Sequence, residues 1–189
     1  MTGSTSKLYE SACEGCSRSQ GNDAVMGGIV RLSGDWILNH LGGPSGFLGW
    51  MALQPRYHRM ELAELTPEEA AALGSNIQRV EAALRQSWFM KFPEDPIRRM
   101  YVVYFFESIF DKKPTKFHLH IHLIPRTEMY GEWLQDSEQS GIIAWDIYKI
   151  GDPMFGLPSL PDHYKKTAKN VTTLMGELSK LLQGGVSAL

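Results

Sequence analysis

Three histidines alternate with apolar residues in the stretch F-H-L-H-I-H-L-I-P-R, residues 117–126. Alternation of this kind is the period of a β-strand, whose successive side chains point to opposite faces. We therefore expect a strand that carries His118, His120 and His122 on one face and sends the apolar residues between them into a core. A row of titratable rings is poor packing material, so the pattern indicates chemistry.

The chemistry that suits such a row is phosphoryl or nucleotidyl transfer. A neutral imidazole attacks phosphorus and leaves again readily, because its pKa lies near neutrality. A neighbouring ring can bind the phosphoryl oxygens or orient the attacking ring, and the preceding Lys112, Lys113 and Lys116 could offset negative charge. Two other interpretations stay open: a catalytic zinc or iron held by the three rings, or an ordinary solvated face.

The two cysteines of the chain, Cys13 and Cys16, stand in a C-x-x-C spacing. They could form a redox pair, supply half of a zinc site, or have no special role. A redox C-x-x-C usually opens a helix after a strand. Because no strand pattern precedes these cysteines, the spacing favours a metal.

Composition limits the class of protein. With 189 residues, 43% of them hydrophobic, the chain predicts a single domain over residues 1–189. The net charge of −2 does not favour nucleic acid or a membrane surface as a partner. No apolar run approaches the ~20 residues of a membrane span, and no apolar leader follows the first residues, so we expect a cytoplasmic protein.

Several elements must position these residues. Strands are expected at 36–38 and 47–53, joined by a glycine-rich turn. Thr66, Pro67 and Glu69 form a capping-box signature, which predicts a helix over residues 67–92. A buried strand is expected at 99–109, paired as an antiparallel hairpin with the histidine run.

The remaining segments are less regular. Residues 1–30 predict a loop-rich entry and residues 127–161 an irregular arm. An apolar stripe predicts a C-terminal helix over residues 162–184, packed at the periphery. The expected fold class is therefore α+β: an antiparallel sheet of about five strands, with the helix 67–92 against its core face.

The motif H-L-H-I-H-L-I resembles the H-φ-H-φ-H-φ-φ signature of the histidine triad (HIT) family, where φ is apolar. The stretch G-W-M-A-L-Q-P-R-Y-H, residues 49–58, is similar to the family's strand ending in Pro-x-x-His. The N-terminal C-x-x-C resembles that of the zinc-carrying branch. The likeness covers a core of about residues 11–126.

This resemblance implies roles for particular residues. His120 would be the nucleophile that forms a nucleotidyl-histidine intermediate, and His122 would contact the α-phosphate. A structural zinc ion would be held by Cys13, Cys16, His58 and His118. The resemblance also implies a homodimer with two sheets side by side.

By the same resemblance, the protein would hydrolyse a nucleoside phosphoramidate or a dinucleoside polyphosphate. Thr115 could bind the leaving-group oxygen, Asn39 the ribose, and Arg126 a phosphate. A purine base would suit apolar walls near Trp36 and Phe47.

Two departures from the family keep other functions open. Lys113-Pro114-Thr115 replaces the usual Gly-Gln-Ser loop, and Trp50 stands where many members have a histidine, which leaves the orientation of His120 unexplained. A nucleotidyltransferase or phosphorylase, or a non-catalytic, zinc-stabilised nucleotide-binding protein, are therefore the alternatives.

Overall fold

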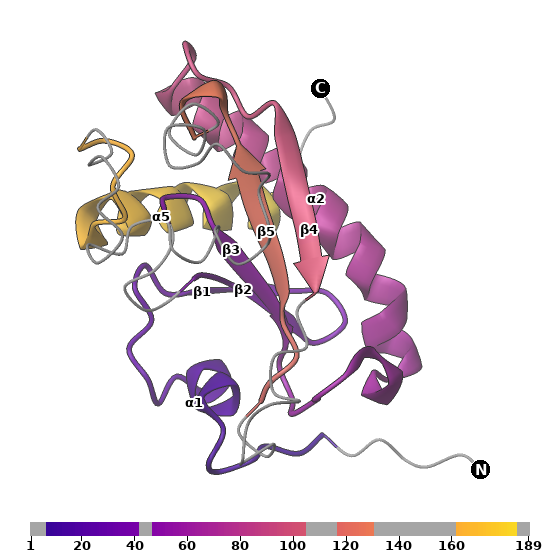
Figure 1. Ribbon diagram of the computed structural model, residues 1–189. Helices are drawn as coiled ribbons and strands as arrows, with labels where there is room; N and C mark the ends of the chain where they lie inside the picture. Colours follow the sequence, from indigo (N-terminus) through magenta and orange to yellow (C-terminus); the bar gives the residue numbers. More distant parts are fainter. Residues whose placement is uncertain (1–6, 42–46, 105–116, 131–161, 185–189) are drawn as a thin grey trace, which may run out of the picture.

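Five strands form one antiparallel sheet in the computed structural model, which describes residues 7–41, 47–104, 117–130 and 162–184. Their order across the sheet is β1-β2-β3-β5-β4 (Figure 1). The strands are β1 (Ile29–Leu32), β2 (Trp36–His40), β3 (Met51–Pro55), β4 (Arg99–Tyr104) and β5 (Ile121–Arg126). The α+β class and the five-stranded antiparallel sheet expected from the sequence are thereby confirmed.

The long helix α2 spans Pro67–Lys91, as the capping signature predicts. Thr66 Oγ1 accepts from the amide of Glu69 at 3.1 Å, and the Glu69 carboxylate accepts from the amide of Thr66 at 2.8 Å. These two bonds satisfy amide groups that a helix start leaves without partners. The expected apolar stripe packs on the core, where Val80, Leu84 and Trp88 are fully buried.

The C-terminal helix α5 (Ala168–Gly184) begins later than expected and is not peripheral. It packs against α2 and against β1 and β2, so both helices cover the same face of the sheet (Figure 1). Its apolar stripe belongs to the main core: Val171, Leu174, Met175, Leu178 and Leu182. The prediction of a peripheral helix was wrong because a second helix is needed to cover β1 and β2.

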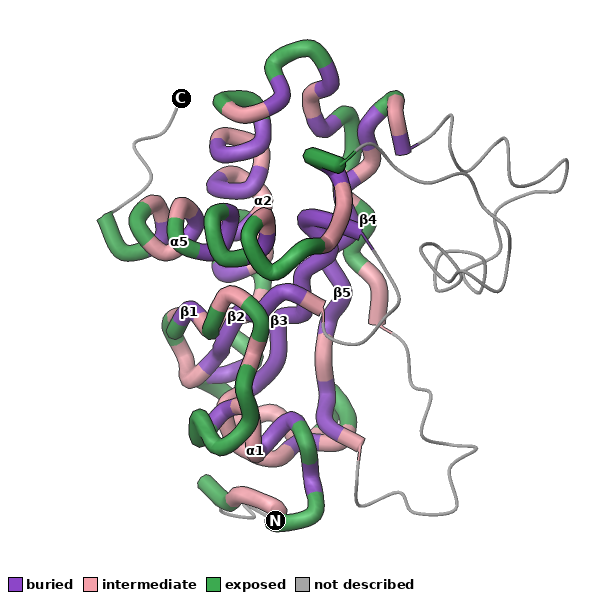
Figure 2. The backbone as a smooth tube through the Cα atoms, turned by 90° about the vertical axis from the view of Figure 1, so that its left-hand side faces the viewer, coloured by how far each residue is buried: buried purple, intermediate pink, exposed green. Residues whose placement is uncertain are grey.

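Strand β4 lies at the edge of the sheet and is largely accessible, which corrects the prediction of a buried strand (Figure 2). Its pairing with β5 is antiparallel, with Val103 opposite His122, so the predicted hairpin partners are correct. The rest of the predicted strand, residues 105–109, falls outside the described residues.

Two elements lie in the segment that was expected to be loop-rich: helix α1 (Glu14–Gln20) and strand β1. Of the predicted irregular arm, residues 131–161 fall outside the described part of the chain. Its first residues turn back onto the core, where Tyr130 is buried and donates to the Leu48 carbonyl at 2.9 Å. None of the helices among the described residues is both long and apolar enough to cross a membrane.

Candidate active site and metal centre

The histidine run enters the sheet later than its alternating pattern predicts. Strand β5 begins at Ile121, so His118 and His120 lie in the segment before it. Strand β3, its partner, ends at Pro55, which has no amide to continue the ladder. The Leu119 amide instead donates to the Arg59 carbonyl at 2.7 Å. The apolar residues of the run are core residues as expected, at 0–4% exposed: Leu119, Ile121 and Leu123.

His120 is half-buried and lines a pocket next to helix α1. Its Nδ1 lies 2.8 Å from the carbonyl oxygen of His118. Because a carbonyl can only accept, Nδ1 must carry the ring proton in this contact, and the lone pair of a neutral ring is then on Nε2.

The pocket beside His120 is lined by several polar side chains among apolar ones. Helix α1 contributes Glu14 and Arg18, and the sheet contributes Asn39 and Gln54. The Asn39 Oδ1 is buried and, within the described chain, has no hydrogen-bond partner. An unsatisfied buried acceptor costs about 1–3 kcal/mol, so a ligand hydroxyl or N–H group would be bound favourably there.

His122 lies next to His120, with their ring centroids 4.6 Å apart in an edge-on arrangement. Its Nδ1 accepts a hydrogen bond from the indole of Trp50 at 3.0 Å. Both side chains are buried, at 1% and 0% exposed. Burial, together with the neighbouring His120, lowers the pKa of His122 to about 3, so this ring is neutral at physiological pH.

Cys13, Cys16, His58 and His118 converge at one place although up to 105 positions separate them in the chain. Their ligand atoms all lie within 4.8 Å of one another. The Sγ–Nδ1 distances are 3.4 Å for Cys13–His118, 3.5 Å for Cys16–His58 and 3.6 Å for Cys16–His118. A tetrahedral zinc ion with ordinary bond lengths would hold sulfur and nitrogen about 3.5 Å apart. This cluster therefore has the donor types and spacing of a closed zinc site.

The surroundings of the cluster also suit a metal. His118 Nε2 lies 2.8 Å from the Pro55 carbonyl and must donate to it, which leaves the His118 Nδ1 lone pair facing the thiols. The Glu10 amide donates to the Cys16 sulfur at 3.3 Å. Burial raises the pKa of Cys16 to about 12. A cation is thus required for its thiolate to persist at neutral pH.

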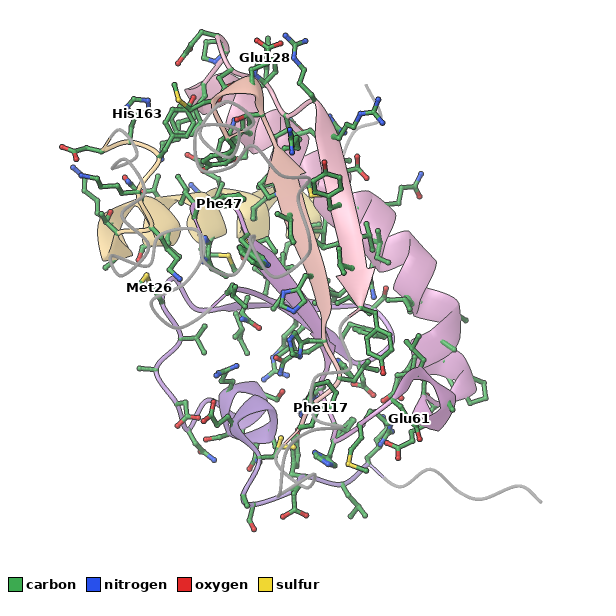
Figure 3. The ribbon with its side chains drawn as sticks, viewed as in Figure 1. Met26, Phe47, Glu61, Phe117, Glu128 and His163 are labelled. Atoms are coloured by element: carbon green, nitrogen blue, oxygen red, sulfur yellow. The ribbon has the colours of Figure 1, made fainter. Side chains whose placement is uncertain are left out.

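One predicted residue, Arg126, is not brought to this site. Arg126 is at the far end of β5, roughly 20 Å along the strand from His120, and its guanidinium contacts the Tyr101 hydroxyl. Figure 3 shows the two ends of this segment, with Phe117 near α1 and Glu128 at the opposite end of the sheet. Thr115 falls outside the described residues.

The predicted stacking walls for a purine are wrong. Trp36 and Phe47 are 1% and 2% exposed and belong to the main core. The Trp36 indole donates to the Glu69 carbonyl at 2.8 Å, on the helix side of the sheet. Because neither ring is accessible to a ligand, these residues no longer support a preference for purine substrates.

Three residues of the site were missed from the sequence: Arg18 and Glu14 on α1, and Gln54 on β3. The sequence contained a signal for Gln54. It stands two residues after Ala52, which lies in a predicted strand, so both side chains face the same side of the sheet. The side chain of Gln54 donates to the Gly15 carbonyl at 3.0 Å and to Ser19 Oγ at 3.2 Å. It thereby holds α1 against the pocket.

An α+β fold with an antiparallel sheet, in which three alternating histidines lie beside a Cys₂His₂ cluster, defines a narrow class of protein. The family model of the HIT domain matches residues 49–129 of the chain, the part that contains β3, α2, β4, β5 and the three histidines. No curated protein matches the chain in sequence.

The solved structures that share this fold include two with a TM-score above 0.5. One is a hypothetical histidine triad nucleotide-binding protein from Sulfolobus tokodaii, with TM-score 0.56, 14% identity and coverage of 91% of this chain and 93% of that one. The other is a Hit-like protein from Bartonella henselae described as involved in cell-cycle regulation, with TM-score 0.51, 15% identity and coverage of 86% and 90%.

Proposed function

We propose that this protein is a nucleotide hydrolase of the HIT type. It would cleave a nucleoside phosphoramidate or a dinucleoside polyphosphate through a nucleotidyl-histidine intermediate. The observation that carries the proposal is the hydrogen bond from His120 Nδ1 to the His118 carbonyl. With its proton held there, the Nε2 of a pocket-lining ring is a nucleophile. The match of residues 49–129 to the HIT domain supports the same role.

The reaction runs in two steps. His120 Nε2 attacks the α-phosphorus, a P–N bond forms, and the bond to the leaving group breaks as that group takes up a proton from solvent. Water then attacks the same phosphorus and loses a proton to solvent, the P–N bond breaks, and the nucleoside monophosphate leaves with His120 neutral again. His122 hydrogen-bonds the α-phosphate oxygens as charge spreads over them. Asn39 Oδ1 accepts from a sugar hydroxyl, and Thr115 contacts the leaving-group oxygen.

Rapid quench into denaturant at alkaline pH, after mixing the protein with a dinucleoside polyphosphate labelled at the α-phosphate, tests the intermediate, because acid hydrolyses a P–N bond to histidine. The wild type is expected to retain label on the protein, and His120→Ala to retain none. His163→Ala is the matched control, because His163 is an exposed histidine remote from Phe117 and the pocket (Figure 3). Label on His120→Ala, or binding of nucleotide by the wild type without label, would contradict the proposal in favour of a non-catalytic binder.

Product analysis separates hydrolysis from group transfer. The third histidine of the triad, His122, favours hydrolysis, because one transferase branch of the HIT family has glutamine at that position. A hydrolase releases nucleoside monophosphate at the same rate with or without added phosphate. Formation of a nucleoside diphosphate when phosphate is present would identify a phosphorylase instead.

We also propose that the Cys₂His₂ cluster binds structural zinc. Elemental analysis of protein purified without added metal should give about one zinc per chain. The double variant Cys13→Ser, Cys16→Ser should lose it, whereas His122→Ala should keep it. The reverse pattern would move the metal to the triad and support a metallohydrolase.

A homodimer completes the proposal. Strand β4 is one of the two outermost strands of the described sheet, and its residues Tyr101 and Val102 are 36% and 46% exposed. An edge strand with exposed apolar side chains can pair with another chain. A second copy of this protein is the partner that the HIT resemblance implies.

A further inference from the structure

The buried indole of Trp50 is placed to control the ring of His122. Trp50 immediately precedes β3, and Ala52, two residues further on, lies opposite His122 in the β3–β5 ladder. The Trp50 ring packs against Phe47, with centroids 5.7 Å apart, and is 0% exposed. Its position is therefore set by both the sheet register and the core.

The hydrogen bond between these two residues determines where His122 holds its proton. An indole N–H can donate but cannot accept. In the 3.0 Å contact from Trp50 Nε1, His122 Nδ1 is therefore the acceptor and has no proton. A neutral His122 must then carry its proton on Nε2, where it is a hydrogen-bond donor.

His120 is held in the opposite tautomer. Its Nδ1 donates to the His118 carbonyl at 2.8 Å, so its Nε2 has the lone pair. The two rings are neighbours, with centroids 4.6 Å apart. One ring of the pair is thus set as a nucleophile, and the other as a donor beside it.

We propose that Trp50 is a positioning residue that fixes His122 in the Nε2–H tautomer and so makes it the hydrogen-bond donor next to the nucleophile. The role in turnover rests on the proposed function, whereas the tautomer is a property of the protein alone. Because an indole does not release its proton in the working pH range, His122 cannot pass a proton to residue 50. His122 therefore acts as a donor rather than as one link of a proton relay through Trp50.

Nitrogen-15 NMR of the wild-type protein tests the tautomer directly. His122 signals, assigned by their absence in His122→Asn, should have the pattern of a neutral Nε2–H ring. A scalar coupling across the hydrogen bond should link Trp50 Nε1 to His122 Nδ1. A proton on His122 Nδ1 in the wild type would overturn the inference, and this measurement needs no folded variant of Trp50.

The variant Trp50→Phe keeps an aromatic ring and removes the N–H group. His122 should then populate both tautomers, and kcat should fall about 10- to 100-fold with little change in KM, as when other orienting partners are removed. Trp36→Phe is the control, because it also deletes a buried indole donor, to the Glu69 carbonyl, but leaves His122 untouched.

The outcomes separate this inference from the proposed function. An unchanged His122 tautomer in Trp50→Phe, or the same loss of kcat in Trp36→Phe, would overturn the role of Trp50. A wild type with the expected tautomer but no nucleotide turnover would instead remove the proposed function and leave the tautomer assignment in place.

Discussion

In each buried histidine among the described residues, a hydrogen bond to a neighbouring group determines whether one ring nitrogen carries a proton. His118 donates to the Pro55 carbonyl, and His122 accepts from Trp50. His40 donates from Nδ1 to the Leu41 carbonyl at 3.1 Å, and its Nε2 accepts from the Gly49 amide at 3.1 Å. In His40 and His122 one ring nitrogen accepts a hydrogen bond, which requires a neutral ring, so protonation of either one competes with folding.

His40 offers a test of this competition away from the metal cluster. Burial lowers its pKa to about 4, against about 6.5 in the unfolded chain. The stability that it contributes is therefore full above pH 6.5 and is lost as the pH falls toward 4. Over this window the free energy of unfolding should decline by about 3 kcal/mol more in the wild type than in His40→Gln. Urea titrations at several pH values measure both slopes; parallel slopes would contradict the assignment.

At the scale of elements, helix α1 joins the two parts of the site. The helix and its N-cap supply the cysteines of the Cys₂His₂ cluster, and Glu14 and Arg18 form one wall of the pocket. It lies directly on the His118 ring, where a Cβ atom at Gly15 would come within 2.4 Å of Cγ. The proposed metal site and the pocket therefore share one short helix.

Gly15→Ala should separate α1 from His118. We expect weaker zinc binding and a lower melting temperature, because the added methyl group has no room beside the ring. The matched control is Gly74→Ala in α2, where a Cβ atom has nothing within 4 Å and the substitution should stabilise by about 0.5–1 kcal/mol. Competition with a chelator and thermal unfolding measure the two effects. Equal behaviour of the two variants would argue against the contact.

At the scale of the whole molecule, the described sheet has a face covered by helices and an accessible edge strand, β4. Helices α2 and α5 pack together over the same face, and their side chains and those of β2, β3 and β5 share one core. Strand β4 is left at the border with its side chains largely accessible (Figure 2). This edge is where a second copy would extend the sheet.

Val102→Glu should therefore dissociate the proposed homodimer, because it places a charge on the exposed edge. Leu62→Glu is the control, since Leu62 is similarly exposed, at 42%, but lies in the 3₁₀ helix η1 (Leu62–Glu64). Light scattering coupled to size-exclusion chromatography gives the mass of each. A monomeric wild type, or equal dissociation by both variants, would rule this edge out.

The sequence alone determined the features that depend on neighbours in the chain. The Thr66–Glu69 capping box predicted the start of α2 correctly because its bonds are local. The alternation around Leu119 and Leu123 identified core residues, since side-chain direction along extended backbone follows from position. The HIT motif likewise indicated the family through its residue types and their spacing, both of which are local.

Only the tertiary structure decided what the distant segments do to one another. It decided that β4 is an edge strand, that Trp36 lies in the core, and that Arg126 is a strand's length from His120. It also paired Trp50 with His122, 72 positions away. The physical reason is that strand order, helix packing and long-range hydrogen bonds depend on how whole surfaces fit together. No local pattern of residues encodes that fit.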